Sequence, residues 1–385
     1  MPPFAPAVLA CFSSPLQPLQ PFSPQYFDAN SDFFTYADDW SSARLAASQT
    51  TAITPLAHST ADTPLPPKAL DNKALKLLMR RPQEVYFLHH LQARLDQPAT
   101  ADPADEPFAP DALTRFQLQQ ELLHSTTPHH TLEKWRMQGE LALGELGHLQ
   151  QSQMLQLRET VLDSLAPWLE DTDTPLGLQS LTLDTDDLTL QLLWGDKPNR
   201  WLVRADGSVL HLVLRAGQLM NKKKPRLHTL TDTWVDHLSA NAAGHNTTSL
   251  LCGSDGLLGL SPLAQEEAQA LLKDLAKVYV HAWAQALPLA CETACAWLVA
   301  QAYAPASNSP AQTAQQAMAA ARTSFEGGFS MGELQKSAYL MRTFERFDDV
   351  WPEMQPWADR IYRPLLQACS VVSDLASEPT EESQA

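Results

Sequence analysis

The sequence lacks the features that would tie it to a membrane or to secretion. No apolar run approaches the roughly 18 residues that cross a bilayer. No Lys or Arg precedes Arg44, so the start lacks the basic leading region of a secretion signal. Five cysteines, an odd number, argue against a disulfide framework. We therefore expect a cytoplasmic protein with no membrane partner.

Common nucleotide and metal motifs are also missing. The chain contains no GxxxxGK[ST], no GxGxxG and no HExxH, so a phosphate cradle or a zinc protease site is not supported. Cys291 and Cys295 lie four residues apart on an expected helix. They form either half of a metal site or two small buried residues, and no second pair of this kind occurs. We expect no cofactor and no metal.

Basic residues are scarce and unevenly placed. The chain has 27 Lys and Arg against 44 Asp and Glu, a formal net charge of −17. Eight of the 27 lie within residues 197–231, where Asp206 is the single acid. A freestanding duplex-DNA binder is usually basic overall, so this balance favours a partner-bound protein with one local cationic strip. The residues that could contact DNA phosphates are Arg204, Arg215, Lys222, Lys223, Lys224 and Arg226. The alternative is a solvated loop whose lysines only maintain solubility.

Composition divides the chain into three parts. Residues 1–68 are rich in Pro, Ser, Thr and aromatic residues, which predicts an extended arm and linker. Residues 69–372 are expected to form one folded domain. The acidic residues 373–385 predict a disordered tail.

Within the folded part, the hydrophobic period changes twice. Apolar residues follow helical spacing before residue 178, alternate through the strands up to about residue 214, and return to helical spacing after Ser261. Asp206-Gly207 predicts a hairpin tip, and "GSDG" predicts a second. Asp111 and Ser261 are the expected caps of two helices, and Pro82 is expected in the first turn of another.

The strand, hairpin and helix that cover residues 178–238 follow the layout of the restriction-endonuclease-like nuclease core. That core carries an acid on one strand and, on the next, an acid, one spacer and a Lys; the acids hold Mg²⁺ and the Lys supports the attacking water. Here Leu193 stands near the first acid's place, Val213 at the second, and Arg215 at the Lys. We therefore expect a mixed sheet that brings Leu193 beside Val213. Aliphatic side chains cannot ligate a cation that needs oxygen. We therefore expect an α/β (α+β) fold, a degenerate PD-(D/E)xK-type core with a small mixed sheet flanked by many helices, and no catalytic residues.

Segments from residue 16 to about residue 367 resemble the C-terminal third of the RecC family, the gamma subunit of bacterial exodeoxyribonuclease V (the RecBCD complex). Among them are "LKLLMRRPQEVYFLHHLQARL", "WRMQGELALGELGHL", "LVLRAGQLMNKKKPRLHTLTDTWVDHL", "LSPLAQEEAQALLKDLAKVY" and "SAYLMRTFERFDDVWPEMQPWADRIYRPLL". They occur in the family's order and at its spacing.

This resemblance implies a nuclease-like fold that has lost its active site. Related active nucleases carry a Gln and a Tyr on the helix after the second strand, where this chain has Leu230 and Trp234. The resemblance further implies a region that helps to split duplex DNA, guides the separated strands and contacts RecB-like and RecD-like subunits. The family's two helicase-like domains would precede residue 16. The chain is accordingly expected to be a split, truncated or reduced relative.

Three functions remain open from the sequence. The first is a non-catalytic subunit of a RecBCD-type helicase-nuclease in DNA repair and recombination. The second is a purely structural docking module without DNA contact. The third is a Mg²⁺-dependent DNA exonuclease, which would need acids at the positions above or a substitute such as Asp196.

Overall fold

The computed structural model describes residues 23–26, 33, 67–95, 110–170, 172–186, 188–195, 200–328 and 330–372. The chain divides into two compact units, Met1–His58 and Ser59–Ala385. In the first unit the description covers the short helix Pro24–Tyr26 with its neighbour Ser23, and Phe33. The expected tail and most of the expected arm lie outside the described residues.

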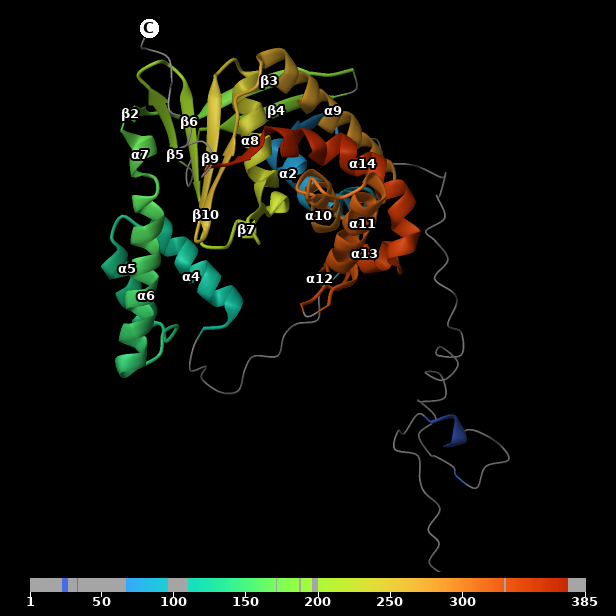
Figure 1. Ribbon diagram of the computed structural model, residues 1–385, viewed down its shortest axis with the longest axis horizontal. Coiled ribbons are helices and arrows are strands. Elements are labelled where there is room, and N and C mark those ends of the chain that lie inside the picture. Colours follow the sequence, from blue (N-terminus) through green and yellow to red (C-terminus); the bar gives the residue numbers. More distant parts are fainter. Residues whose placement is uncertain are drawn as a thin grey trace, which may run out of the picture. The chain divides into compact units, whose positions relative to one another are not determined.

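Two mixed sheets build the β part of the second unit (Figure 1). The six-stranded sheet has the order β11-β10-β9-β6-β5-β2, and its neighbours are antiparallel except for the parallel pair β6 and β9. The three-stranded sheet has the order β1-β4-β3, with β1 parallel to β4. The strands β7 and β8, of two residues each, form a separate antiparallel hairpin. The bounds are β1 Ala69–Asp71, β2 Thr172–Pro175, β3 Gln179–Asp184, β4 Thr189–Trp194, β5 Arg200–Arg204, β6 Val209–Leu214, β7 Met220–Asn221, β8 Lys224–Pro225, β9 Thr247–Gly253, β10 Gly256–Leu260 and β11 Cys369–Val371.

Helices cover both faces of the six-stranded sheet. Along β6, Leu210, Leu212 and Leu214 pack with residues of α4, α6 and the adjoining Leu165, whereas Val213 packs on the opposite side against the core that contains α8. This alternation follows from the two-residue repeat of a strand. The helix bounds are α2 Asn72–Arg80, α3 Pro82–Val85, η2 Tyr86–His90, α4 Ala112–His124, α5 Pro128–Met137, α6 Gly144–Asp163, α7 Ala166–Leu169, η3 Leu227–Leu230, α8 Thr231–Ala242, α9 Gln265–Ala284, α10 Cys291–Ala302, α11 Pro310–Glu326, α12 Glu333–Lys336, α13 Ala338–Thr343 and α14 Phe347–Ala368.

Two of the three predicted helix signals are confirmed. The Asp111 carboxylate accepts a hydrogen bond from the Thr114 N–H at 2.6 Å and caps α4, and Pro82 occupies the first turn of α3. The prediction for Ser261 is wrong, because α9 begins at Gln265 with Ala264 in the N-cap position. Ser261 instead links other elements: its N–H donates to the Ala368 carbonyl, and its own carbonyl accepts from a buried histidine of α8.

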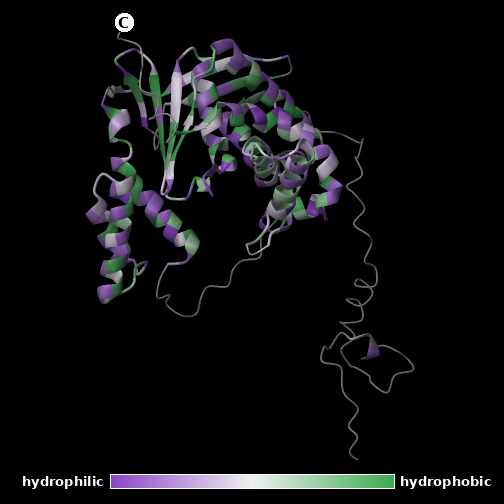
Figure 2. Cartoon of the chain, viewed as in Figure 1, coloured by the Kyte–Doolittle hydropathy of each residue, from purple (hydrophilic) through white to green (hydrophobic). Residues whose placement is uncertain are grey.

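The predicted change of period agrees with the observed elements. The fold is a mixed α/β arrangement with many helices and small mixed sheets. Helices carry hydrophobic and hydrophilic residues side by side, as expected when one face is buried (Figure 2). Within the part of the chain that the structure describes, no helix combines the length and the apolar character needed to cross a bilayer.

The β5-β6 hairpin and the helix that follows it position the region of interest. Gly207 closes the hairpin with a φ of 81°, a conformation that glycine adopts without strain, and so confirms the predicted tip. The chain then passes through β6 and α8 into β9, which lies parallel to β6. The Arg215 N–H donates to the Cys252 carbonyl at 2.8 Å and extends this pairing one residue beyond β6. Arg215 is thus fixed at the carboxyl end of a central strand.

Candidate nucleic-acid interface

The expected juxtaposition of Leu193 and Val213 is wrong. Leu193 lies in β4 of the three-stranded sheet, whereas Val213 lies in β6 of the six-stranded sheet. The Leu193 N–H donates to the Asn72 side-chain oxygen at 2.6 Å, and its side chain is 56% exposed. Pairing of β4 with β1, which begins more than a hundred residues earlier, holds it there. Alternation in the sequence identifies a strand but does not say which sheet the strand joins.

Of the two strands that neighbour β6, β5 is antiparallel to it and offers an arginine near Val213. Arg200 pairs with Leu212, the residue before Val213. The charge of Arg200, together with burial as the larger cause, lowers the pKa of His124 on α4. An acid would have to stand on this strand for the two positions to share a metal ion. Among the described residues of β5 there is no carboxylate.

A cavity of about 260 Å³ lies at the carboxyl end of β6. It combines an aliphatic floor with charged and hydrogen-bonding side chains from four other elements. Its lining residues are Lys76, Phe116, Gln120, His124, Val213, Leu214, Arg215, Thr229, Asp232, Thr233, Asp236 and Leu251. The predicted positions Val213 and Arg215 therefore open onto one cavity.

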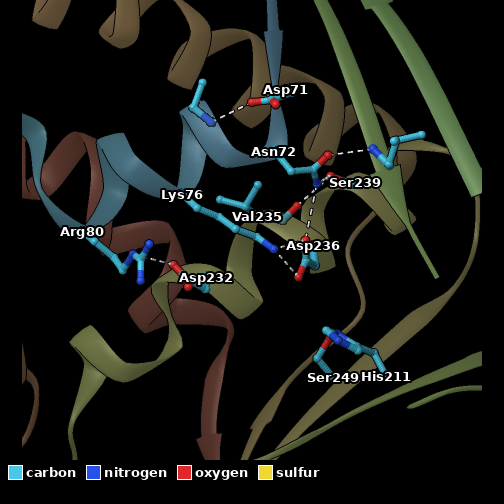
Figure 3. Close-up of polar contacts among 12 residues, drawn as sticks. Asp71, Asn72, Lys76, Arg80, His211, Asp232, Val235, Asp236, Ser239 and Ser249 are labelled. Carbon is cyan, nitrogen blue, oxygen red and sulfur yellow. Dashed lines mark hydrogen bonds and ion pairs between the residues drawn. The ribbon is translucent and has the colours of Figure 1, made fainter. Parts of the chain in front are cut away.

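Two carboxylates of α8 reach this cavity, and cations of α2 neutralise both (Figure 3). The Lys76 ammonium lies 2.7 Å from the Asp236 carboxylate. The Arg80 guanidinium lies 3.1 Å from Asp232. Burial raises the pKa of Asp236, and the charge of Lys76 opposes that shift. The two ion pairs are stacked one turn apart because each partner is four residues from the next on its own helix.

Asn72 extends this arrangement to the three-stranded sheet. Its side-chain amide nitrogen donates to Asp236 at 3.3 Å (Figure 3). Its side-chain oxygen accepts from the Leu193 N–H. A second donation reaches the Ser239 hydroxyl at 3.5 Å. The amide thereby links α8 to β4 and helps to fix the carboxylate that Lys76 holds.

Arg215 differs from the other cations at the cavity because it has no acidic partner. Its guanidinium lies 5.8 Å from the centre of the Phe116 ring, and among the described residues it makes no ion pair or side-chain hydrogen bond. Burial lowers its pKa; the charge of Asp232 opposes this, and the charges of Arg226 and Arg80 add to it. The guanidinium remains charged, since arginine is protonated under all ordinary conditions.

The lysines of the cationic strip form the tip of a tight hairpin between β7 and β8. Asn221 pairs with Lys224, so Lys222 and Lys223 are the two turn residues, and both are exposed. Their φ angles are 51° and 66°, in the left-handed region that disfavours residues with a Cβ. The Asp255 carboxylate accepts from the Leu219 and Met220 N–H groups at 2.7 and 3.1 Å and secures the base of the hairpin.

The predicted strip does not form one continuous surface. Arg226 lies near Arg215 and donates to the Gln218 side chain at 3.5 Å. Arg204 lies at the opposite end of β6, next to the Asp206-Gly207 turn and beside Trp168. The strip therefore splits into a cluster at the carboxyl end of β6 and a separate arginine at its amino end.

Sequence reasoning missed three residues at or near the cluster at the carboxyl end of β6: the cations Lys76 and Arg80, and His228. Burial is the main cause that lowers the pKa of His228 to about 4; the charge of Glu292 opposes the shift, and the charges of Arg215, Arg226 and Lys336 add to it. The spacing of Lys76 and Arg80, four residues apart on one helix, and of two acids four apart on another, was a signal that could have revealed matching faces.

Among the described residues, neither the acids beside the β3-β4 turn nor the two cysteines of α10 belong to a metal-binding group. Asp184 accepts from the Thr189 hydroxyl and Asp186 lies 3.8 Å from Lys277, while Asp196 lies outside the described residues. Cys291 and Cys295 are buried in α10. Across the described segments, no group of three or more His, Cys, Asp or Glu side chains is arranged to hold a metal ion.

Leu230 and Trp234 are 0% and 1% exposed and belong to the main core. They are packing residues, and neither side chain has a hydrogen-bond acceptor at the positions predicted to correspond to the Gln and Tyr of active nucleases. A GxSxG pattern at 328–332, which sequence reasoning overlooked, lies between α11 and α12. A nucleophile elbow requires a strand-to-helix turn, so this pattern carries no hydrolase chemistry.

The core beneath the cavity contains a buried polar chain. His211 Nδ1 lies 3.1 Å from the Ser249 hydroxyl, which lies 2.9 Å from His237 Nδ1. His237 Nε2 donates to the Ser261 carbonyl at 3.1 Å. Because that carbonyl can only accept, His237 Nδ1 accepts from the Ser249 hydroxyl, and His211 Nδ1 donates to it. Burial lowers the pKa of His237 to about 4 and that of His211 well below its ordinary value, so both rings are neutral at neutral pH.

Comparison with known proteins gives two matches. The family model of the RecC C-terminal domain matches residues 67–302. The RecBCD enzyme subunit RecC of Escherichia coli (strain K12) is 26% identical over an alignment of 295 residues, which covers 72% of this chain and 23% of the relative. The chain thus spans about a quarter of the length of this curated relative. The matched range includes β6, the cavity and the lysine hairpin.

Proposed function

Because the chain belongs to the RecC C-terminal domain family, we propose that it is the C-terminal part of a RecC-type subunit and works without catalysis of its own. In this proposal it assembles with RecB-like and RecD-like subunits into a helicase-nuclease of the exodeoxyribonuclease V type. The assembly would act in double-strand-break repair and recombination. The family match over residues 67–302 is the observation that carries the proposal. Residues 69–372 would form the domain concerned.

The proposal includes a degenerate nuclease core of the restriction-endonuclease-like type. Its support is the succession of the β5-β6 hairpin, α8 and the parallel strand β9. Val213 and Arg215 would occupy the places of the second acid and the lysine, with Arg200 rather than Leu193 on the neighbouring strand. A valine and two arginines supply no oxygen for Mg²⁺. Residues of this kind favour a subunit that handles DNA over one that cuts it.

The lysine hairpin is the proposed point of DNA contact. It presents Lys222 and Lys223 on exposed positions at the cost of an unfavourable backbone conformation. Residues held in sparsely populated conformations cost on the order of 1 kcal/mol each and occur preferentially at functional sites. A solvated loop that served only solubility would gain from Asn or Gly at these two positions. The presence of lysines at these two strained positions therefore favours contact with phosphates.

A structural docking role has separate support on the helices α4 to α6. Large hydrophobic side chains are exposed there, with Met137 at 77%, Leu143 at 81% and Leu149 at 55%. Apolar side chains grouped on one surface commonly mark protein interfaces. We propose that this helical surface meets a motor subunit, while the lysine hairpin meets DNA. The two roles do not exclude one another.

The test uses the full chain together with purified RecB-type and RecD-type subunits. Affinity capture first measures assembly, and fluorescence anisotropy then measures binding of forked DNA at two salt concentrations. The variant Lys222→Asn/Lys223→Gly removes two charges from the hairpin. The matched control, Lys273→Gln/Lys277→Gln, removes two exposed charges from α9, away from the strip.

We expect the chain to capture both partner subunits. Of the two variants, only the hairpin variant should bind DNA more weakly than wild type. Loss of two phosphate contacts should reduce the slope of log affinity against log salt by about 1.8 on duplex, or about 1.4 on single strands. Failure to capture either subunit would contradict the assembly proposal. Equal DNA affinity for the hairpin variant, its control and the wild type would leave only the docking role.

A further inference from the structure

We propose that the cavity at the carboxyl end of β6 binds one phosphate of the DNA backbone through Arg215 and leaves it uncut. This inference rests on the proposed function, since it names the ligand of the degenerate centre within a DNA-handling subunit. It adds a second contact that is distinct from the lysine hairpin. The chemistry concerned is a phosphodiester monoanion held by a guanidinium.

The unpaired state of Arg215 is the first argument. Six arginines of the described chain form ion pairs with acids: Arg80, Arg81, Arg136, Arg322, Arg360 and Arg363. Arg215 has none, although it is half-buried and lines a cavity. A charge withdrawn from water without a partner is unfavourable. An anion in the cavity would remove that penalty.

The second argument is that the backbone on both sides of Arg215 is fixed. The Gln120 amide nitrogen donates to the Leu214 carbonyl at 2.7 Å, and its oxygen accepts from the Ala216 N–H at 2.9 Å. The Phe116 ring supports the guanidinium at 5.8 Å. Gln120 and Phe116 both lie on α4, so one helix holds the peptide and the side chain. A preorganised guanidinium loses little entropy when it binds an anion.

The third argument concerns the two carboxylates that face the same cavity. Asp236 is held by Lys76 and Asp232 by Arg80, at 2.7 and 3.1 Å. Each negative charge is therefore matched by a cation of α2, and the positive charge of Arg215 is left in excess. Arg226 adds a further cation within electrostatic reach of Arg215. The balance of charge in the cavity favours an anion over a metal ion.

The fourth argument is the supply of neutral donors. The Thr233 hydroxyl lines the cavity and has no hydrogen-bond partner among the described residues. A guanidinium fork binds two phosphate oxygens side by side, and a hydroxyl can donate to a third position. Val213 lies next to Arg215 on the floor and can hold no metal, so no water would be activated for attack. Such a site grips a phosphate without hydrolysing it.

The experiment measures two probes on the full chain. Inorganic phosphate is titrated by ³¹P line broadening, and a 12-nucleotide oligothymidylate without terminal phosphates is titrated by fluorescence anisotropy. The variants are Arg215→Gln, which removes the charge, and Arg215→Lys, which keeps the charge but not the fork. Arg342→Gln removes an exposed arginine charge on α13 and serves as the control. Lys222→Asn/Lys223→Gly reports on the hairpin separately. Circular dichroism verifies that each variant is folded.

We expect Arg215→Gln to weaken the binding of both probes about tenfold or more, as for loss of a charge-assisted contact. The affinities of Arg215→Lys should lie between those of Arg215→Gln and wild type. The control and the hairpin variant should leave phosphate binding unchanged. Weaker phosphate binding with unchanged oligonucleotide binding would indicate a free-anion site and overturn the proposal. If Lys222→Asn/Lys223→Gly weakens oligonucleotide binding and Arg215→Gln does not, the phosphate site at Arg215 is overturned, while the proposed DNA-handling function stands. If neither Arg215→Gln nor the hairpin variant changes oligonucleotide affinity, both the phosphate site and the proposed DNA-handling function are overturned.

Discussion

We predict that acid destabilises the protein through the buried polar chain of His211, Ser249 and His237, and that His237 contributes most clearly. When both histidine rings are neutral, the Ser249 hydroxyl donates to His237 Nδ1 and accepts from His211 Nδ1. Protonation of His237 would place a second donor against the serine oxygen and leave the hydroxyl proton without an acceptor. His237 is 0% exposed, so no water replaces the lost contact.

The magnitude follows from the pKa of His237, which burial lowers from 6.5 to about 4. A shift of this size corresponds to about 3 kcal/mol in total. The unfolded chain takes up the proton below pH 6.5, whereas the folded chain resists it until about pH 4. The contribution of His237 to the free energy of unfolding is therefore fully present above pH 6.5, and it is lost as the pH falls from 6.5 to 4. By pH 5 the loss is about 2 kcal/mol.

The assay compares wild type with His237→Gln, whose amide retains a donor and an acceptor. Urea unfolding gives the free energy of unfolding at pH 8 and pH 5, and the change between the two is compared. The comparison is needed because burial raises the pKa of Glu333 to about 7, which stabilises the fold as the pH falls. We expect wild type to lose about 2 kcal/mol more than His237→Gln. His130→Gln, on the exposed side of α5, should follow wild type.

Equal pH dependence in wild type and His237→Gln would refute this reasoning. It would mean that the ring is already protonated in the folded state, or that the unfolded chain binds no more protons than the folded one. A greater loss in His237→Gln than in wild type would contradict the sign. Any constant loss from imperfect packing of the glutamine cancels, because only the difference between the two pH values is used.

Two further changes test the electrostatics and strain around the cavity. Lys222→Asn/Lys223→Gly should raise the free energy of unfolding by about 1 kcal/mol in thermal or urea unfolding, because Asn and Gly suit the two positive φ angles; a loss of stability would show that the lysines do not strain the turn. Lys76→Met should cost about 3 kcal/mol in urea unfolding, because it leaves the Asp236 carboxylate buried and unpaired. The double change Lys76→Met/Asp236→Asn should recover most of that loss, and a double change as unstable as the single one would contradict the ion-pair argument.

The local features of the fold were predictable from the sequence. The hairpin tip at Asp206-Gly207, the Asp111 cap and the break before α3 at Pro82 each depend on a few adjacent residues. So does the succession of helices, strands and helices, because hydrophobic period is a local property. The placement of Val213 and Arg215 at the end of one strand also followed, since the strand and its boundary could be recognised together.

Contacts between distant segments were not predictable in this way. Leu193 was expected beside Val213, yet β4 pairs with β1. These strands are more than a hundred residues apart, and a local sequence pattern does not reveal which distant strand is the partner. The ion pair between Lys76 and Asp236 joins residues 160 positions apart. Its members look like ordinary surface charges until α2 and α8 are placed together. For the same reason Arg204 could not be separated from the rest of the strip beforehand.

The contrast between a net charge of −17 and a local group of cations has a physical consequence. An acidic surface repels a polyanion at long range, whereas Arg215, Arg226 and the lysine hairpin attract it at the carboxyl end of β6. For the proposed DNA contact, the two effects together restrict approach to that end. Repulsion elsewhere contributes to orientation without any contact, and like the attraction it weakens as salt shortens the Debye length. Partial neutralisation of acids far from the cavity should therefore raise non-specific DNA binding more than it raises binding at Arg215.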